Sequence, residues 1–542
     1  MRLPKLPNRW NFVLQGWPDT AGPPVLQPKQ DTTRPRASCP HATSRSTAFS
    51  FQVVLGAGVV FGVPFGLFYR LILFHFYVRG SFLLDTGLLA SLMYHATPAL
   101  NLPPSLGGES FFAFHVAPIL MLVSAASTLL PFSMPQVFAG FVGLCHGLLA
   151  LAVYWLLVEG HGGRRGWPLA LAVLASVAFA CNGLALDIAR FPHFETFAAA
   201  SLLLFFVALV LEHRLVAVAC FLLAVATRED VGLHAFGFLA VWATVNRFRR
   251  VPWRETIWIA GFAIAGLAWS AASLLLQHRA FPNASSFVRV YLGDPPLSHL
   301  SAPLVATRLA GWLWLHPAII LPAIAAAIWA RRSHNPHVIV GYVACIPWAL
   351  LHVLAASELA GWMVGYYGYP FLVAMAWPWL AVRIRRRQDP AAPVLAMPSA
   401  SLLAMVALSL LPLGRTYDPG RISLPAAFLQ APSAALQART DRGIAAIVAA
   451  RPALGRLVVD NSVAALRPWA FARTEVAGWS DQPPDTVVFF SEGFDAERLR
   501  AVTDLPGHYA IPGTELRIST DRPAQTMQAL GFTQSERVQA GW

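Results

Sequence analysis

Side chains that could bind or transfer a substrate are concentrated in residues 191–230. This stretch opens with Phe-Pro-His-Phe-Glu and ends in Thr-Arg-Glu-Asp, and two short apolar arms lie between. Carboxylates and imidazoles can transfer protons, and a guanidinium can bind a phosphate. Ionisable residues at the ends of short membrane helices are costly and indicate a functional site. The alternative is that these residues only cap helices at the membrane interface and act as topology signals. The candidates are His193, Glu195, Arg228, Glu229 and Asp230.

Two further candidates precede this stretch. Asp85 stands in Leu-Leu-Asp-Thr-Gly, just after the first apolar run, where it could act as a general base or an electrostatic anchor. The alternative is a helix N-cap, a position that Asp favours. His115 opens an apolar block in Phe-His-Val-Ala-Pro, and an imidazole there should face the protein interior or a cavity unless it caps the helix at the interface.

The remaining candidates lie later in the chain. Arg289 could add a second cation for a phosphate. Tyr367 belongs to Gly-Tyr-Tyr-Gly-Tyr-Pro, which is either part of a binding site or an aromatic belt at the membrane interface. No metal-ligand spacing, G-x-G-x-x-G, Walker or H-E-x-x-H motif occurs, so no cofactor is predicted. A divalent cation at Asp85 stays an open alternative.

The composition predicts the elements that hold these residues. Of 542 residues, 56% are hydrophobic and only 12% are charged, about half the charged share of a soluble domain. Net charge is +13, but the arginines form short clusters between apolar runs, as in cytoplasmic loops of membrane proteins. Nucleic acid is therefore excluded as a partner. The five cysteines support neither a disulfide framework nor a metal site.

The chain is predicted to be an all-α polytopic membrane protein with a small soluble domain. Residues 1–47 form a disordered basic tail on the cytoplasmic side, and residues 48–413 form the transmembrane domain, with an outer loop at 75–112. A membrane helix needs about 20 apolar residues, and by this rule the sequence contains about twelve apolar blocks, some of them short. The blocks lie near 48–74, 113–131, 136–158, 168–187, 195–212, 214–229, 231–246, 257–277, 306–330, 338–356, 365–382 and 395–413.

The placement of arginine puts the basic turns inside and the candidate residues outside. The two blocks within 113–158 must then make an odd number of crossings, so one should be a half-helix or lie along the interface. This gives about 11–12 membrane helices, with an outer C-terminus. Residues 414–542 should form an extracytoplasmic α/β domain, with a helix at 436–450 and buried strands at 457–460 and 486–490.

The order of these motifs resembles that of a family of polytopic membrane proteins, the domain-of-unknown-function 2079 family. The resemblance covers roughly residues 75 to 500 and rests on Asp-x-Gly, Phe-His-x-x-Pro, Phe-Pro-His-x-Glu, a basic-Glu-Asp turn and Tyr-Tyr-x-x-Pro. That family looks like a distant relative of the C-type membrane glycosyltransferases, in which an acidic residue of the first outer loop is catalytic. The corresponding residue is Asp85. An acidic pair in that loop is reduced to Asp85-Thr86, and a Lys of the relatives is Arg228, a poorer proton donor.

The resemblance implies a bacterial inner-membrane protein that transfers a sugar from a polyprenyl-phosphate donor to an acceptor at the outer face. Membrane lipids and the donor would be its partners. Asp85 would orient or deprotonate the acceptor, and Arg228, with Arg289 or His193, would neutralise the phosphate. The alternatives are a transporter or lipid flippase, with the charges lining a pathway, and a non-catalytic scaffold that has lost the chemistry.

Overall fold

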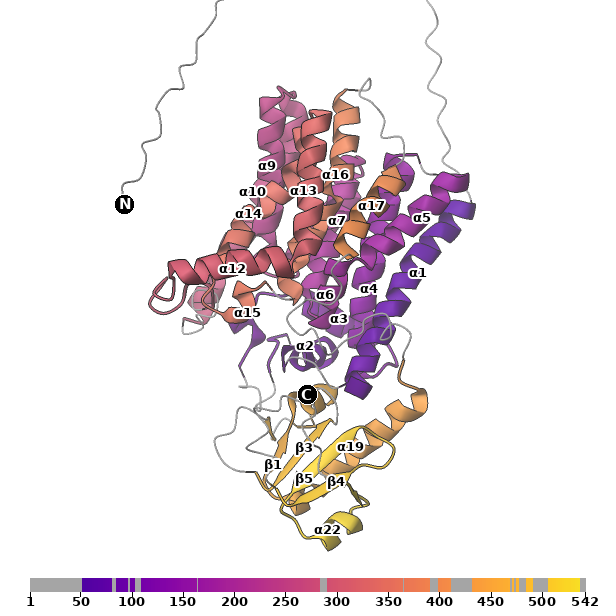
Figure 1. Cartoon of the computed structure of the whole chain (residues 1–542), viewed down its shortest axis with the longest axis vertical. Helices are drawn as coiled ribbons and strands as arrows, with labels where there is room; N and C mark the ends of the chain where they lie inside the picture. The colour runs from indigo at the N-terminus through magenta and orange to yellow at the C-terminus, as the bar shows by residue number, and fades with distance from the viewer. Residues whose placement is uncertain are drawn as a thin grey trace, which may run out of the picture. The chain divides into compact units, whose positions relative to one another are not determined.

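The computed structural model is mostly helical, as the composition predicts (Figure 1). It describes residues 51–79, 84–95, 98–102, 109–162, 164–282, 290–363, 365–389, 398–410, 431–467, 470–471, 474–476, 484–490 and 505–536. The helices are α1 Phe51–Phe74, α2 Leu84–His95, α3 Ile119–Ser127, α4 Met134–Trp155, α5 Gly166–Ala180, α6 Gly183–Arg190, α7 Glu195–Val210, α8 Arg214–Val225, α9 Val231–Phe248, α10 Trp253–Ala280, α12 Ala302–Leu315, α13 Pro317–Ser333, α14 Val340–Val353, α15 Glu358–Gly361, α16 Tyr369–Gln388 and α17 Pro398–Leu410.

The chain is a multi-pass membrane protein. Within the described residues, 4 helices are long and apolar enough to cross a membrane, or up to 6 if each of two bent helix pairs is one span. These four spans contain α1, α4, α10 and α14. Three further apolar helices, α7, α8 and α17, are shorter than a full span. The predicted 11–12 crossings thus include blocks that form shorter or broken helices.

Two predicted blocks are broken rather than continuous. The 168–187 block bends by 41° between α5 and α6, where Asn182 accepts hydrogen bonds from the backbone of Leu184 and Ala185 and so starts a new helix. The 306–330 block bends by 82° between α12 and α13. The cause is Pro317, because a proline disfavours helical backbone in the residue before it, here His316.

The ambiguous region between residues 113 and 158 contains one long helix and one short one. α4 continues through a π-helical turn, Leu156–Gly160, into a span of 27 residues. By contrast, α3 has only 9 residues, about 14 Å at 1.5 Å per residue, too short to cross. Of the two blocks, α3 is thus the one to which the prediction of a half-helix or an interfacial helix applies.

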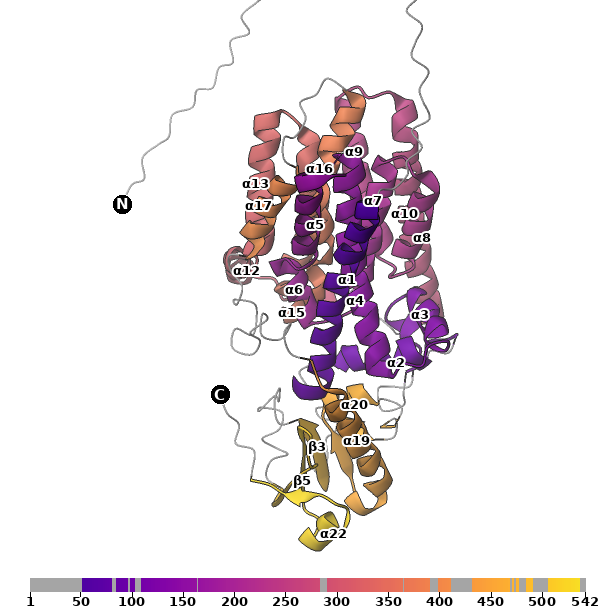
Figure 2. The same cartoon turned by 90° about the vertical axis from the view of Figure 1, so that its right-hand side faces the viewer.

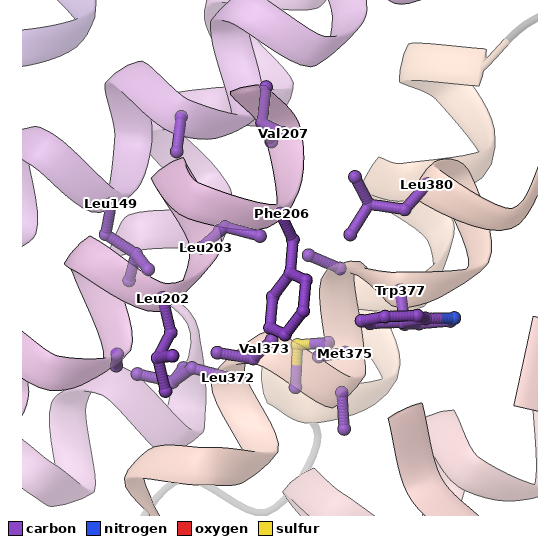
Figure 3. Close-up of a cluster of buried hydrophobic side chains, with 14 of the residues drawn as sticks. Leu149, Leu202, Leu203, Phe206, Val207, Leu372, Val373, Met375, Trp377 and Leu380 are labelled. Carbon is purple, nitrogen blue, oxygen red and sulfur yellow. The ribbon is translucent and has the colours of Figure 1, made fainter. Parts of the chain in front are cut away.

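The core of the bundle lies where α7 packs against both α4 and α16, and all three helices run along the bundle (Figure 2). α7 is buried around nearly its whole circumference, as expected for an interior membrane helix. Phe206 of α7 packs edge-on against Trp377 of α16, with ring centroids 5.0 Å apart (Figure 3). Leu202 and Leu203 of α7 and Leu372 and Leu380 of α16 surround this contact and have no exposed surface.

The basic turns meet at one end of the bundle, called the basic end. His213 pairs with Glu159 at 3.2 Å, and Arg387 pairs with Glu212 at 2.5 Å. Arg385 donates to the Ser333 carbonyl at 2.6 Å. These contacts join the turns that the arginine pattern assigns to a single side.

The C-terminal residues form a mixed sheet with helices, confirming the predicted α/β domain. The elements are α19 Ala434–Leu454, β1 Leu457–Val459, α20 Asn461–Leu466, β2 Glu475–Val476, β3 Thr486–Phe490, β4 Gly507–Ala510, β5 Leu516–Thr520, α22 Ala524–Ala529 and β6 Thr533–Gln534. The strand order is β2-β1-β3-β5-β4-β6. β1 is parallel to β2 and β3, and the other pairs are antiparallel. The predicted helix and both predicted strands match α19, β1 and β3.

Helix α2 packs against α20 of this domain. The two helices approach closely at Gly87, where an added Cβ would lie 2.5 Å from Ala465 Cα. The segment that carries Asp85 is therefore in contact with the C-terminal domain.

Candidate functional site

The charged cluster consists of Glu195, Arg228, Glu229, Asp230, His193 and His115. At its centre, Arg228 in the α8–α9 turn donates from Nε to Asp230 Oδ1 at 2.7 Å and from Nη1 to Glu195 Oε1 at 2.5 Å. Nη2 donates to Asp230 Oδ2. All three side chains are at most 8% exposed. Arg228 thus pairs internally, and its charge is already neutralised.

His193 and Glu195 form the wall of the cluster next to the tyrosine segment. His193 Nδ1 lies against Glu195 Oε2, and both side chains are buried. The imidazole stacks on Tyr366, with ring centroids 4.2 Å apart and planes 18° from parallel. The segment between α6 and α7 is therefore joined to the tyrosines that precede α16.

Glu229 and His115 form a carboxylate–imidazole pair. His115 Nδ1 donates to Glu229 Oε1 at 2.9 Å, and the Val116 backbone N–H donates to Oε2 at 2.8 Å. Glu229 is only 6% exposed, whereas His115 is 32% exposed. With Nδ1 donating to the carboxylate, Nε2 of a neutral imidazole is an acceptor. This pair can take or release a proton on the more open side of the cluster.

Close packing of α9 on α10 positions the Arg228–Asp230 turn. Gly232 and Gly266 meet where a Cβ on Gly232 would overlap the Gly266 carbonyl. Ser270 of α10 donates to the Glu229 carbonyl at 2.5 Å. The Ile119 N–H donates to the Ala226 carbonyl at 2.9 Å, which brings the His115 segment to the same turn.

Aromatic rings continue from the cluster toward α14. Tyr367 lies 4.4 Å from Tyr366 and 4.9 Å from His352, measured between ring centroids. Its carbonyl also accepts from Trp348 Nε1 at 2.9 Å. Tyr291 packs edge-on against His352, with ring centroids 5.3 Å apart. Tyr367 is thus part of a packed aromatic wall beside the cluster.

The structure does not describe the side chains of two predicted site residues. Asp85 lies in the first turn of α2, and its side chain is outside the described part of the chain. Arg289 also lies outside the described residues. In the described part of the structure, no group of three or more His, Cys, Asp or Glu side chains could hold a metal ion.

The sequence analysis did not single out three buried polar residues of the bundle. His234 lies 3.8 Å from Asp230 on the next turn of α9, and its i+4 spacing was an available signal. His352 and Arg308 had no such signal, because their apolar helices gave no reason to single out one polar residue.

One guanidinium and three carboxylates meet in the cluster, so the acidic groups outnumber the arginine. The cluster lies at the first turn of α7, which has 16 residues and is about 24 Å long, less than the roughly 30 Å hydrocarbon core. The charges therefore lie at one end of a helix that is shorter than this core.

The fold and the site together define a polytopic membrane protein with a buried charged cluster and a small α/β domain. No family model and no curated protein matches the sequence, so membership of the domain-of-unknown-function 2079 family is not confirmed. Among solved structures, the chain is similar to the crystal structure of ArnT from Cupriavidus metallidurans bound to undecaprenyl phosphate. Identity is 12%, the TM-score is 0.43, and the match covers 88% of this chain and 99% of that chain. The identity and the TM-score are too low for this similarity to indicate what the chain does.

Proposed function

We propose that this chain is a membrane glycosyltransferase that uses a polyprenyl-phosphate sugar and acts at the outer face of the membrane. The observation that carries the proposal is the charged cluster itself. Three separate segments bring ionisable groups together at the end of helices too short to span. Buried charge of this kind in a membrane protein is costly and is kept where it serves binding or catalysis.

In the proposed reaction, the acceptor hydroxyl attacks the anomeric carbon of the donor. Its proton passes to a base, and the bond from that carbon to the phosphate oxygen breaks with its electron pair on the phosphate. Asp85 would orient or deprotonate the acceptor. The His115–Glu229 pair is a second group that could accept or return a proton. Arg228 would hold Glu195 and Asp230 in place.

The bent pairs α5–α6 and α12–α13 favour a second candidate, a transporter or lipid flippase, since broken helices are typical of transporters. Against it, the cluster lies at one end of α7 and the Glu212 turn at the other, so the charged groups described at these positions do not form a midplane site. A non-catalytic scaffold is the remaining alternative.

The proposal is tested by incubating the purified full chain with radiolabelled polyprenyl-phosphate sugars and a panel of acceptors, including polyprenyl-linked and glycan acceptors. We expect transfer by the wild type and loss of transfer in Asp85→Asn, with the unfolding temperature unchanged. Glu212→Gln at the basic end is the matched control and should transfer normally. Full transfer by a well-folded Asp85→Asn protein would refute the role of Asp85. Substrate-dependent charge movement without any transfer would favour the transporter.

A further inference from the structure

The bend between α5 and α6 leaves one backbone carbonyl without its helical donor. In a continuous helix the Leu184 N–H would donate to the Ala180 carbonyl, one turn earlier. Here Asn182 Oδ1 accepts that N–H at 2.8 Å, and it accepts the Ala185 N–H at 3.0 Å as well. The side chain that starts α6 therefore uses the donor that would otherwise complete the last turn of α5.

This carbonyl lies at a depth where water cannot hydrogen-bond to it. α5 begins beside the arginines of the basic end and has 15 residues, about 22 Å, so it ends within a hydrocarbon core of about 30 Å. Backbone polar groups at this depth need partners within the protein, since an unsatisfied one is costly. Asn182 Nδ2 donates to the Phe179 carbonyl at 2.6 Å, so the Ala180 carbonyl needs another donor.

His146 of α4 is that donor. Its Nδ1 lies 3.2 Å from the Ala180 oxygen, and the residue has no exposed surface. Nε2 has no hydrogen-bond partner among the described residues, so the imidazole bonds only through Nδ1, which must carry the hydrogen. His146 lies near the middle of the span Met134–Gly160, where an ionisable residue is costly and indicates a function.

Helix α1 holds the ring of His146 in this orientation. The ring stacks on Phe68 of α1, with centroids 3.4 Å apart and planes 8° from parallel. Gly143, one turn earlier on α4, allows α1 to approach so closely that an added Cβ would lie 2.7 Å from the Phe65 oxygen. α1, α4 and α5 all contact one another (Figure 2). The packing of α1 on α4 thus fixes the donor opposite the Ala180 carbonyl.

The bend also determines where one wall of the charged cluster lies. α6 has only 8 residues and leads directly to His193 and Glu195. It packs against the 3-10 turn Gly365–Gly368, which carries Tyr366. Because His193 stacks on Tyr366, a different angle between α5 and α6 would shift these two rings relative to each other.

We propose that His146 is a positioning residue for the charged cluster. Its hydrogen bond to the Ala180 carbonyl holds the bend between α5 and α6, and the bend sets where His193 and Glu195 lie. Asn182 breaks the helix and His146 satisfies the carbonyl that the break exposes, so the two side chains act together. The inference rests on the proposed function only for what the cluster does, since the state of α6 is measured without turnover.

The test compares hydrogen–deuterium exchange of the α6 amides in the detergent-purified full chain. We expect His146→Leu, which removes the donor, to speed this exchange about 10- to 100-fold, because opening of α6 would relieve an unsatisfied buried carbonyl. His146→Asn offers an amide N–H in place of Nδ1–H and should exchange as the wild type does. Ser176→Ala is the matched control, because this serine is equally buried in α5 but donates only within its own helix, to the Ala172 carbonyl.

A double variant separates this role from simple packing. In Asn182→Ala the Leu184 N–H is free to bond the Ala180 carbonyl, so adding His146→Leu should then change the exchange little. If His146→Leu alone does not fold, recovery of folding in the double variant supports the inference, and failure of both counts against it.

Wild-type exchange in a folded His146→Leu protein would overturn the inference. An equal effect of His146→Leu with and without Asn182→Ala would also overturn it, as would faster exchange in His146→Asn to the level of the Leu variant. If the exchange results are as expected but the wild type transfers no sugar, the proposed function fails and this inference stands.

Discussion

Arg228 determines the stability of the charged cluster, because its guanidinium compensates both Glu195 and Asp230. Removing one partner of a buried ion pair costs about 3–5 kcal/mol, since the other charge is left without compensation. We therefore expect Arg228→Gln and Glu195→Gln each to lower the unfolding temperature in detergent. The double variant should lose less than the sum of the two. Strict additivity would show that the two side chains are not coupled.

Replacing His115 should have a different effect from replacing Arg228 or Glu195. His115 is the most exposed member of the cluster, so its loss should leave the fold intact. If the His115–Glu229 pair transfers a proton, His115→Asn should lower kcat by about 10²- to 10⁴-fold. The measurement is sugar transfer at saturating donor, with Glu109→Gln as the control from the neighbouring segment. An unchanged kcat would leave Asp85 as the base.

Among the elements, the α9–α10 crossing controls where the cluster lies. Gly232→Ala would force its Cβ into the Gly266 carbonyl and Ser270 Oγ, so we expect a loss of about 1–3 kcal/mol, typical of overpacking. Gly261→Ala on α10 is the matched control. Nothing lies within 4 Å of the added Cβ there, and alanine favours a helix by about 1 kcal/mol. Thermal unfolding of both variants should give shifts of opposite sign; a destabilised Gly261→Ala would contradict this account.

In the C-terminal domain, Asp485 lies directly before β3 and makes a pH-dependent contact. The Arg456 N–H donates to Asp485 at 2.8 Å, and this bond, followed by Arg522, lowers the pKa of the Asp485 carboxyl. A lowered folded-state pKa adds stability above the unfolded pKa of about 3.9, and that stability is lost as pH falls through the folded value.

Asp485→Asn should therefore make the domain more sensitive to proteolysis at pH 7 and remove part of its acid sensitivity below about pH 4. Proteolysis across that pH range, with pepsin at the acidic end, measures both effects. Asp521→Asn, a neighbouring exposed carboxylate, is the control. Identical acid sensitivity in wild type and Asp485→Asn would exclude Asp485 as its source.

For the whole molecule, we expect the basic end and the charged cluster to face opposite sides of the membrane. We expect single cysteines at Glu109 and Gln528 to react with an impermeant reagent from outside, and single cysteines at Glu212 and Arg331 only from inside. All four positions are tested in a chain without its native cysteines. Labelling of Glu109 and Gln528 from opposite sides would separate the cluster from the C-terminal domain and rule out a shared site.

The sequence by itself determined the membrane class, the short arms that became α7 and α8, and strands β1 and β3. These are local properties, because hydropathy and alternation are set by neighbouring residues. The breaks at Asn182 and Pro317 also have local causes, but the length of the apolar blocks concealed them.

Only the tertiary structure decided which charges meet. Arg228 pairs with Glu195 across 33 positions, and His115 pairs with Glu229 across 114. Without these contacts, Arg228 could equally have been a phosphate ligand. Arg308 gave no signal at all, since one arginine in an apolar helix resembles a topology residue until its burial is known. Pairing and burial depend on how distant helices pack, and no local pattern encodes that.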